Sequence, residues 1–268
     1  MEKGWKAQLE LEFAKQGEKT LLVKRRQFGP LTVQRPFYPE GDVCHVYLLH
    51  PPGGIVGGDH LHFSIQAREN AHALITTPAA GKFYRSSGKQ AIQQVNIKVD
   101  NNAMIEWLPQ ETIIYDGAYL KSTVNVELSE HSRFIGWEIL SLGRPSSGEG
   151  FDCGIAQMNW QIYCEHRPLF LERLQLDAKA FSACWGLNSH SACGTLFATP
   201  VSAQSLDALR ELIGSTPGRG VTQIDEMLIC RAIDSRSDKL RGFFEQVWKI
   251  VREDTLERTI CTPRIWAT

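Results

Sequence analysis

The chain contains 268 residues, 43% of which are apolar, and it includes seven Trp and twelve Phe. This composition provides a large packed core and excludes a globally disordered protein, and the length is ordinary for a single all-β domain. Acidic and basic residues nearly cancel, leaving a formal net charge of −1, so no general electrostatic field favours a nucleic acid or an anionic membrane as partner.

The N-terminal segment, MEKGWKAQLELEF, lacks an apolar run of the length that a signal peptide needs. No later run is long and apolar enough to cross a bilayer. These features predict a cytoplasmic protein without a membrane partner. Seven cysteines are scattered along the chain without a CxxC pair, so we expect most of them to be small buried hydrophobic residues rather than ligands of a structural zinc ion.

A stretch rich in glycine and proline, HPPGGIVGGDH, covers residues 50–60. Gly53 and Gly58 have the spacing of the two glycines of a P-loop, but Asp59 and His60 stand where that loop needs a lysine and a hydroxyl. A carboxylate beside a phosphate repels it at short range. The dinucleotide pattern GxGxxG is not met either, so the chain is not expected to be an NTPase.

Three segments repeat one order of strand, short polar turn and strand. They are FSIQARENAHALITTP from Phe63, VNIKVDNNAMIEWLP from Val95 and VNVELSEHSRFIGWE from Val124. Polar corners are expected at 69–70, 100–102 and 129–131. The repetition suggests successive hairpin-like layers and predicts a mainly β chain, either a layered β-solenoid (β-helical) or a sandwich-like stack.

Two loops and one further strand follow from local composition. TTPAAGKFYRSSG (76–88) mixes glycines, hydroxyls, aromatic residues and cations, which indicates a loop with a positive rim whose Arg85 can pair with a carboxylate. LGRPSSGEGFDCG (142–154) indicates a second glycine-rich loop. RPLFLERL (167–174) is typical of a strand whose Glu172 faces opposite to the next residue.

Two segments near the C-terminus show helical spacing of apolar residues instead. The first is 205–213, which glycines follow, and the second is 239–256, whose apolar residues fall on one face that we expect to join the core. The expected organisation is a single domain, residues 1–268, with a β body over about 1–200 and a helix-containing portion over about 201–268.

Potential metal ligands occur in short groups at Cys44-His45, Asp59-His60-Leu61-His62, Cys164-Glu165-His166 and His190-Ser191-Ala192-Cys193. On a strand, His60 and His62 point to the same face. Imidazole and thiolate suit nickel, copper or zinc. However, such short groups are more often surface histidines and buried thiols than tight metal sites.

Several stretches together resemble the urease accessory protein family UreD, also called UreH. In order, they are FGPLTVQRPFYPE, HPPGGIVGGD, KFYRSSG, EWLPQETI, LGRPSSGE, ERL and the terminal PRIW. The resemblance runs from about residue 28 to the C-terminus. It implies a non-enzymatic, nickel-delivering chaperone with a mainly β, stacked fold and a small helical portion.

The resemblance also implies partners. Members bind UreF directly and UreG through UreF, and the assembly docks on apo-urease. A passage through the β body would carry transient nickel, with no tightly bound cofactor, and the positions that match family motifs are Asp59 and Glu172. Acids in such a passage would bind nickel weakly enough to release it. His60, Cys164 and His166 do not belong to the matching motifs.

Partner contacts are expected in the two loops identified above. The residues that we assign to them are Lys82, Phe83, Tyr84, Arg85, Gly143, Arg144, Pro145 and Glu149. Two alternatives stay open at this point. One is a β-solenoid hydrolase that uses Asp116 with Glu111 or Glu138; the other is a metal-storage protein.

Overall fold

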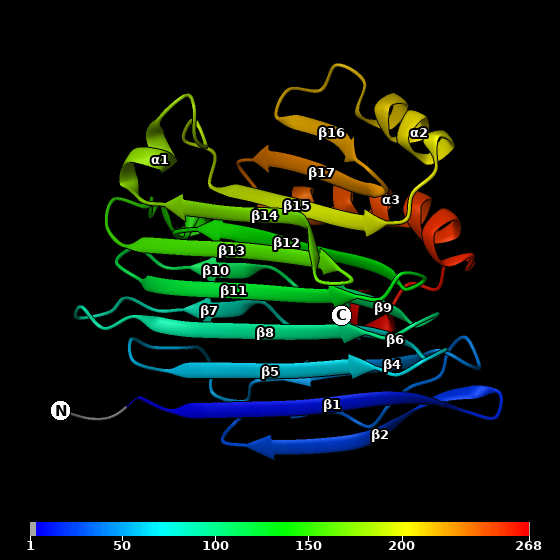
Figure 1. Cartoon of the computed structure of the whole chain (residues 1–268). Helices are drawn as coiled ribbons and strands as arrows, with labels where there is room; N and C mark the ends of the chain where they lie inside the picture. Colours follow the sequence, from blue (N-terminus) through cyan, green and yellow to red (C-terminus); the bar gives the residue numbers. More distant parts are fainter. Residues whose placement is uncertain (1–3, 268) are drawn as a thin grey trace.

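Two β-sheets face each other in this computed structural model, which describes residues 4–267 (Figure 1). The first sheet has seven strands. Their spatial order is β14 (Arg167–Leu176), β13 (Ile155–Cys164), β11 (Tyr119–Leu128), β8 (Ala91–Val99), β5 (His60–Ala67), β1 (Lys6–Gln16) and β2 (Lys19–Phe28). Its central strands are parallel, and an antiparallel strand closes each end.

The second sheet has ten strands. Its main order is β16 (Arg219–Ile224), β17 (Met227–Asp234), β15 (Ala192–Thr199), β12 (Arg133–Leu142), β9 (Met104–Leu108), β6 (His72–Thr76), β4 (Cys44–Leu49) and β3 (Thr32–Val33). The short strand β10 (Thr112–Ile114) pairs in parallel with the end of β12, and β7 (Gly81–Phe83) pairs in parallel with β10.

The chain winds as a solenoid, which confirms the prediction of stacked layers. Each repeated segment crosses from one sheet to the other at its polar corner, so β5 pairs in parallel with β8 and β6 pairs in parallel with β9. The expected hairpin-like pairing within a segment is therefore wrong. Asn70 and Asn102 adopt φ values of 61° and 54° at the corners, a left-handed conformation that asparagine tolerates better than most residues.

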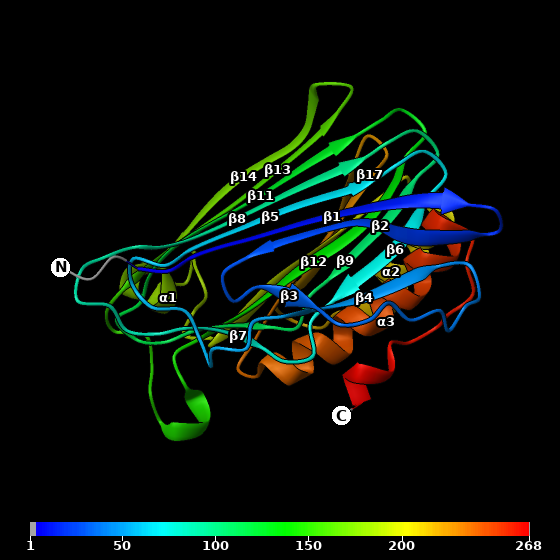
Figure 2. The same ribbon diagram turned by 90° about the horizontal axis from the view of Figure 1, so that it is seen from below.

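Helix α2 (Ala203–Ile213) and helix α3 (Ser237–Leu256) confirm the two predicted helical segments. The apolar face of α3 is buried, with Phe244, Val247 and Trp248 fully enclosed against the outer face of the ten-stranded sheet. Figure 2 shows both helices on this one side of the body, opposite the seven-stranded sheet. A short helix, α1 (Ala178–Ser182), was not predicted and follows β14.

A buried cluster of charged and polar side chains fixes α3 to the sheet. The fully buried Arg252 donates to both carboxylate oxygens of Glu106 on β9, at 3.1 and 3.2 Å, and to both of Glu40, at 2.7 and 2.8 Å. His72 contacts Glu106 at 3.1 Å, and His45 contacts Glu40 at 2.6 Å. The guanidinium and the two histidines together offset the cost of enclosing the Glu106 and Glu40 carboxylates.

The sequence predicts that the chain has no membrane span and that most of its cysteines are buried. In the described part of the chain, no helix is long and apolar enough to span a membrane. All seven cysteines are free, but only Cys44, Cys193 and Cys230 are buried. The expectation that most cysteines are buried is therefore wrong, because Cys153 and Cys184 lie in exposed loops and the other two are partly exposed.

Replacing Arg252 by Met is expected to destabilise the chain by about 3–5 kcal/mol, because two buried carboxylates lose their cation. Chemical denaturation measures the loss. Arg210→Met is the matched control: Arg210 is exposed and pairs only with Asp207 in the same helix, so its removal is expected to cost less than about 0.5 kcal/mol. A loss below about 1 kcal/mol for R252M would contradict the role of the cluster.

Candidate functional site

A cavity of about 760 Å³ lies between the two sheets. Most of its wall is apolar, with Phe63, Val95, Val124 and Trp160 contributed by the inner face of the seven-stranded sheet. Registers place these four side chains in one row, because Phe63 pairs with Val95, Val95 with Val124, and Val124 with Trp160. Parallel stacking of the coils therefore builds a continuous wall.

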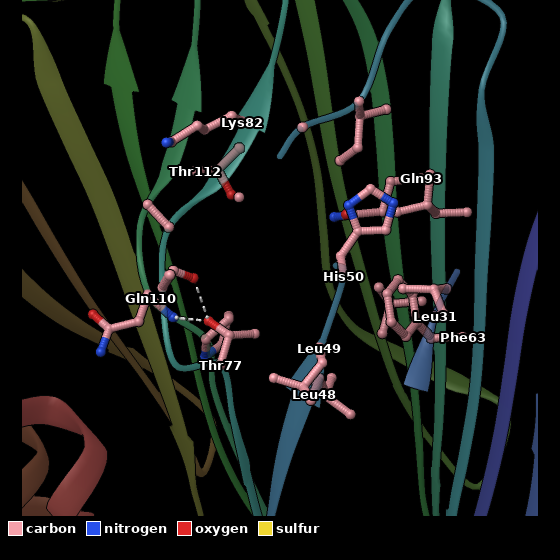
Figure 3. A pocket seen from close by; sticks show the side chains of 18 of the residues that line it. Leu31, Leu48, Leu49, His50, Phe63, Thr77, Lys82, Gln93, Gln110 and Thr112 are labelled. Carbon is pink, nitrogen blue, oxygen red and sulfur yellow. Dashed lines mark hydrogen bonds between the residues drawn. The ribbon is translucent and has the colours of Figure 1, made fainter. Parts of the chain in front are cut away.

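Polar side chains gather at one side of this cavity. In Figure 3, Lys82, Thr112 and Gln110 stand on one wall, and His50 and Gln93 stand on the opposite wall above the apolar Leu31 and Phe63. The Gln110 N–H donates to the Thr77 hydroxyl at 2.9 Å, which fixes the chain around the opening. We call this side, with His50, Thr77, Lys82, Gln110 and Thr112, the polar mouth.

The HPPGG segment forms one edge of the polar mouth, since residues 50–54 line the cavity. The Tyr84 hydroxyl donates to the Gly53 carbonyl at 3.0 Å, and Ile55 bridges to Phe83 on β7. A side chain at Gly54 would meet the Tyr84 ring at 2.3 Å, so glycine is required for this close approach. The segment is a tight turn, and its residues 50–54 face the cavity.

Asp59 ties the end of the same segment to the start of the chain. Its carboxylate accepts the Trp5 N–H at 2.8 Å and the Val56 N–H at 3.0 Å. Burial lowers the pKa of His50, and the charge of Asp59 opposes this shift. The charge of Asp59 therefore acts on His50 at the polar mouth, although Asp59 itself does not line the cavity.

Glu138 on β12 is the one carboxyl side chain among the cavity-lining residues. It keeps some contact with the cavity space but is enclosed by protein. Burial raises its pKa to about 8; the nearby indole N–H of Trp160 opposes this, and the charge of Glu172 reinforces it. No cation offsets the burial. The sequence around Glu138 indicates only a strand, so its place in a cavity wall is not predicted and Glu138 enters there only as a hydrolase candidate.

Glu172 lies on β14 and points inward, whereas Arg173 lies on the opposite face, as the strand pattern predicts. Its carboxylate pairs with Arg231 on β17 at 2.5 Å. The structure does not bring Glu172 and Asp59 together, because β13, β11 and β8 lie between β14 and the strand that follows Asp59. The two predicted passage residues sit at separate parts of the body.

The two predicted partner loops do meet, at a surface cleft lined by Tyr84, Arg85, Tyr115, Asp116, Arg144, Gly148, Glu149, Gly150 and Asp152. Arg85 pairs with Asp116 at 2.7 Å, and Arg144 pairs with Glu149 and stacks over the Tyr115 ring. We call this site the loop cleft. Pairing of these charges across three loops gives the cleft a defined shape.

Not every predicted contact residue reaches the loop cleft. Phe83 is buried and anchors β7, and Lys82 lines the cavity instead. Gly143 has φ 70°, and a Cβ there would lie 2.2 Å from the Gly150 carbonyl, so it holds the loop closed. Pro145 begins a short 3₁₀ turn, Pro145–Ser147, which projects from the body in green in Figure 2.

The short groups of potential metal ligands stay apart in the structure. Among residues 4–267, no group of three or more His, Cys, Asp or Glu side chains is placed to hold a metal ion. His60 and His62 share the outer face of β5, where His62 contacts Asn96 at 2.9 Å. Cys164 ends β13, and His166 is exposed in the turn after it.

The acids of the hydrolase alternative are also separated. Asp116 lines the loop cleft, where it binds Arg85 and the backbone N–H groups of 152 and 153, whereas Glu138 lines the cavity. Glu111 lines neither. No pair among these three acids therefore faces one common substrate site.

Comparisons with known proteins agree with one another. The family described as UreD urease accessory protein matches residues 6–267. The urease accessory protein UreD of Alkalilimnicola ehrlichii is 44% identical over 99% of this chain and 92% of its own length. UreD proteins of Trichormus variabilis and Citrobacter koseri are 41% and 40% identical, each over 99% of this chain and over 97% and 93% of their own lengths.

The enclosed carboxyl of Glu138 predicts a specific pH dependence. Its folded pKa of about 8 exceeds the ordinary value of 4.5, so the unfolded state ionises first and the wild type loses stability as pH rises from about 4.5 to 8. Glu138→Gln removes this loss. Its free energy of unfolding relative to wild type is expected to rise by roughly 2 kcal/mol or more between pH 5 and 8.

Chemical denaturation at several pH values measures this difference. Glu127→Gln is the matched control, because Glu127 is exposed on the outer face of β11, and it is expected to follow the wild-type pH curve. Parallel stability curves for E138Q and the wild type would show that Glu138 ionises normally in the folded chain.

Proposed function

The chain belongs to the UreD family of urease accessory proteins, and on that premise we propose that it is a cytoplasmic nickel-delivery chaperone for urease. In this role it binds UreF directly and UreG through UreF, docks on apo-urease, and passes nickel through the cavity between its sheets. Nickel is cargo rather than a resident cofactor. The GTP chemistry belongs to a partner, in keeping with the missing P-loop lysine and hydroxyl around Asp59 and His60.

The observation that carries this proposal is the enclosed Glu138 carboxyl in the wall of a cavity of about 760 Å³. A transfer route needs donors that bind a divalent ion weakly and release it. His50 at the polar mouth supports this, because burial lowers its pKa and a neutral imidazole is a metal ligand. The imidazole of His50 and the carboxyl of Glu138 are single donors in the cavity lining, and a single donor binds a borderline cation weakly.

The large apolar share of the cavity wall also fits a transfer route. Side chains such as Phe63 and Val124 offer nickel no ligand, so the ion is not trapped between the polar positions. A storage protein would need the opposite arrangement, with several strong donors converging on each ion. Retention of stoichiometric nickel by the purified chain after dialysis would therefore favour storage over delivery.

The loop cleft is the proposed contact with a protein partner. It joins two loops distant in sequence, and its exposed guanidinium groups, Arg85 and Arg144, can exchange their internal contacts for contacts with a partner. We assign this contact to UreF, the direct partner in the proposed function. A pull-down of UreF by the wild type and by an Arg85→Ala/Arg144→Ala variant tests this assignment.

Nickel loading of urease tests the function as a whole. Co-expression with urease subunits, UreF and UreG is expected to raise the nickel content of purified urease only when this chain is present. Asp59→Asn is expected to lower that content several-fold, because the negative charge near His50 is lost while an amide oxygen still accepts one backbone N–H. Pull-down of UreF by this variant should be unchanged.

Asp100→Asn serves as the control, since Asp100 lies at a polar corner and pairs with Lys98 and Gln66. Normal loading by D59N would remove Asp59 from the mechanism. Equal nickel contents with and without the chain would contradict the proposed function itself.

A further inference from the structure

A row of polar side chains crosses the otherwise apolar interior beyond Glu138. Glu138 on β12 pairs in register with Thr195 on β15, and Thr195 pairs with Arg231 on β17. Residues that are directly opposite on neighbouring strands point to the same face. This row faces the seven-stranded sheet, because the Arg231 guanidinium reaches across to Glu172 at 2.5 Å.

On the seven-stranded sheet, a second row of side chains also leads to the Glu172–Arg231 pair. Val124 and Trp160 line the cavity, and Trp160 pairs in register with Glu172. Glu172 is therefore the next side chain after the cavity wall on one sheet, and Arg231 stands two strands beyond Glu138 on the other. Both rows end at one ion pair.

Accessibility increases along this route. Glu138 and Thr195 are partly accessible, while Cys193 and Phe197 on either side of Thr195 along β15 are buried. The Glu172 side chain is 17% exposed and that of Arg231 is 52% exposed. The polar row thus runs from Glu138 in the cavity wall to the partly exposed Glu172–Arg231 pair.

Electrostatics connects the two acids of this route. The charge of Glu172 contributes to raising the pKa of Glu138 and also that of the buried Cys193. In addition, the indole N–H of Trp160 lies close enough to Glu138 to oppose the rise of its pKa, although it makes no hydrogen bond of ordinary geometry. Glu138, Glu172 and this N–H are therefore polar groups set together in an otherwise apolar wall.

The Glu172–Arg231 pair is suited to open. Arg231 is half exposed and otherwise only approaches the Phe170 ring, 5.9 Å from its centroid. The guanidinium already reaches solvent and can turn towards it, whereas Glu172 is largely buried and needs another cation in its place. Glu172 would then be left as a partly buried carboxylate with room for another cation.

We propose that the Glu172–Arg231 ion pair is the gate of a second opening of the cavity, with Arg231 holding Glu172 until a divalent cation arriving past Glu138 takes its place. The inference rests on the proposed function for its cargo. No bond is made or broken beyond coordination: the guanidinium leaves the carboxylate, and the divalent ion takes up that carboxylate. Arg231 is a positioning residue, since it acts through Glu172.

Direct titration of the purified chain with Ni²⁺ tests the gate. Arg231→Gln frees Glu172 from its internal cation and is expected to tighten Ni²⁺ binding about tenfold. Glu172→Gln is expected to weaken binding, and the double variant R231Q/E172Q should lose the gain. Arg231→Lys, which keeps the cation, should stay near wild type. Arg173→Gln is the matched control on the outer face of β14.

Unchanged Ni²⁺ affinity in R231Q, or a gain that persists in the double variant, would overturn the gate. If R231Q were to unfold, E172Q would still decide, because an affinity equal to that of the wild type removes Glu172 from the site. These outcomes are separable from the proposed function. If the nickel content of urease depends on the chain but R231Q binds Ni²⁺ with wild-type affinity, only the gate is rejected. If the nickel content of urease is the same with and without the chain, the proposed function is rejected.

Discussion

Parallel, in-register hydrogen bonding between successive coils is the constraint on which the rest of this structure depends. It places equivalent residues of every coil in one row, as with Phe63, Val95, Val124 and Trp160 on the inner face. A row of apolar side chains forms a wall of the cavity, and a row with polar members forms the polar route that begins at Glu138. The apolar wall of the cavity and the polar row beyond Glu138 are both consequences of this stacking, while loops such as residues 50–54 complete the cavity.

Two buried glutamates show how neighbours decide the state of a carboxyl in this body. Burial acts to raise the pKa of Glu106, but His72 and Arg252 outweigh it and hold that pKa at about 2. Glu138 has no such cation, and its pKa rises to about 8. Glu106 is thus a permanent anion that anchors α3, whereas Glu138 is a carboxyl that can gain stabilisation from a visiting cation. Glutamate thus stabilises the fold at position 106 and supplies a polar group to the cavity wall at position 138.

Alternation of residues was enough to predict the strands, the polar corners and the stacked architecture, because those features depend on local sequence. The pairing was predicted wrongly as hairpin-like, since alternation is the same whether a strand pairs with its neighbour in sequence or with the next coil. The site was harder. Residues 50–54 were recognised as a turn, but the cavity that they face is formed by residues from distant strands. Phe83 and Lys82 were assigned to a partner surface because burial of a short loop strand leaves no clear mark in the sequence.

The proposed function requires nickel to cross the interior of this chain. Val124→Trp tests it most directly, because Val124 lies in the middle of the cavity wall and a larger side chain there occupies the space without touching the polar mouth, the loop cleft or the Glu172–Arg231 gate. Thr123→Trp, one residue away on the outer face of β11, adds the same bulk outside. The nickel content of urease co-expressed with each variant and with UreF and UreG is the measurement. Loss of nickel with V124W, retained nickel with T123W and equal UreF binding by both are predicted; normal loading by a folded V124W chain would contradict an interior route.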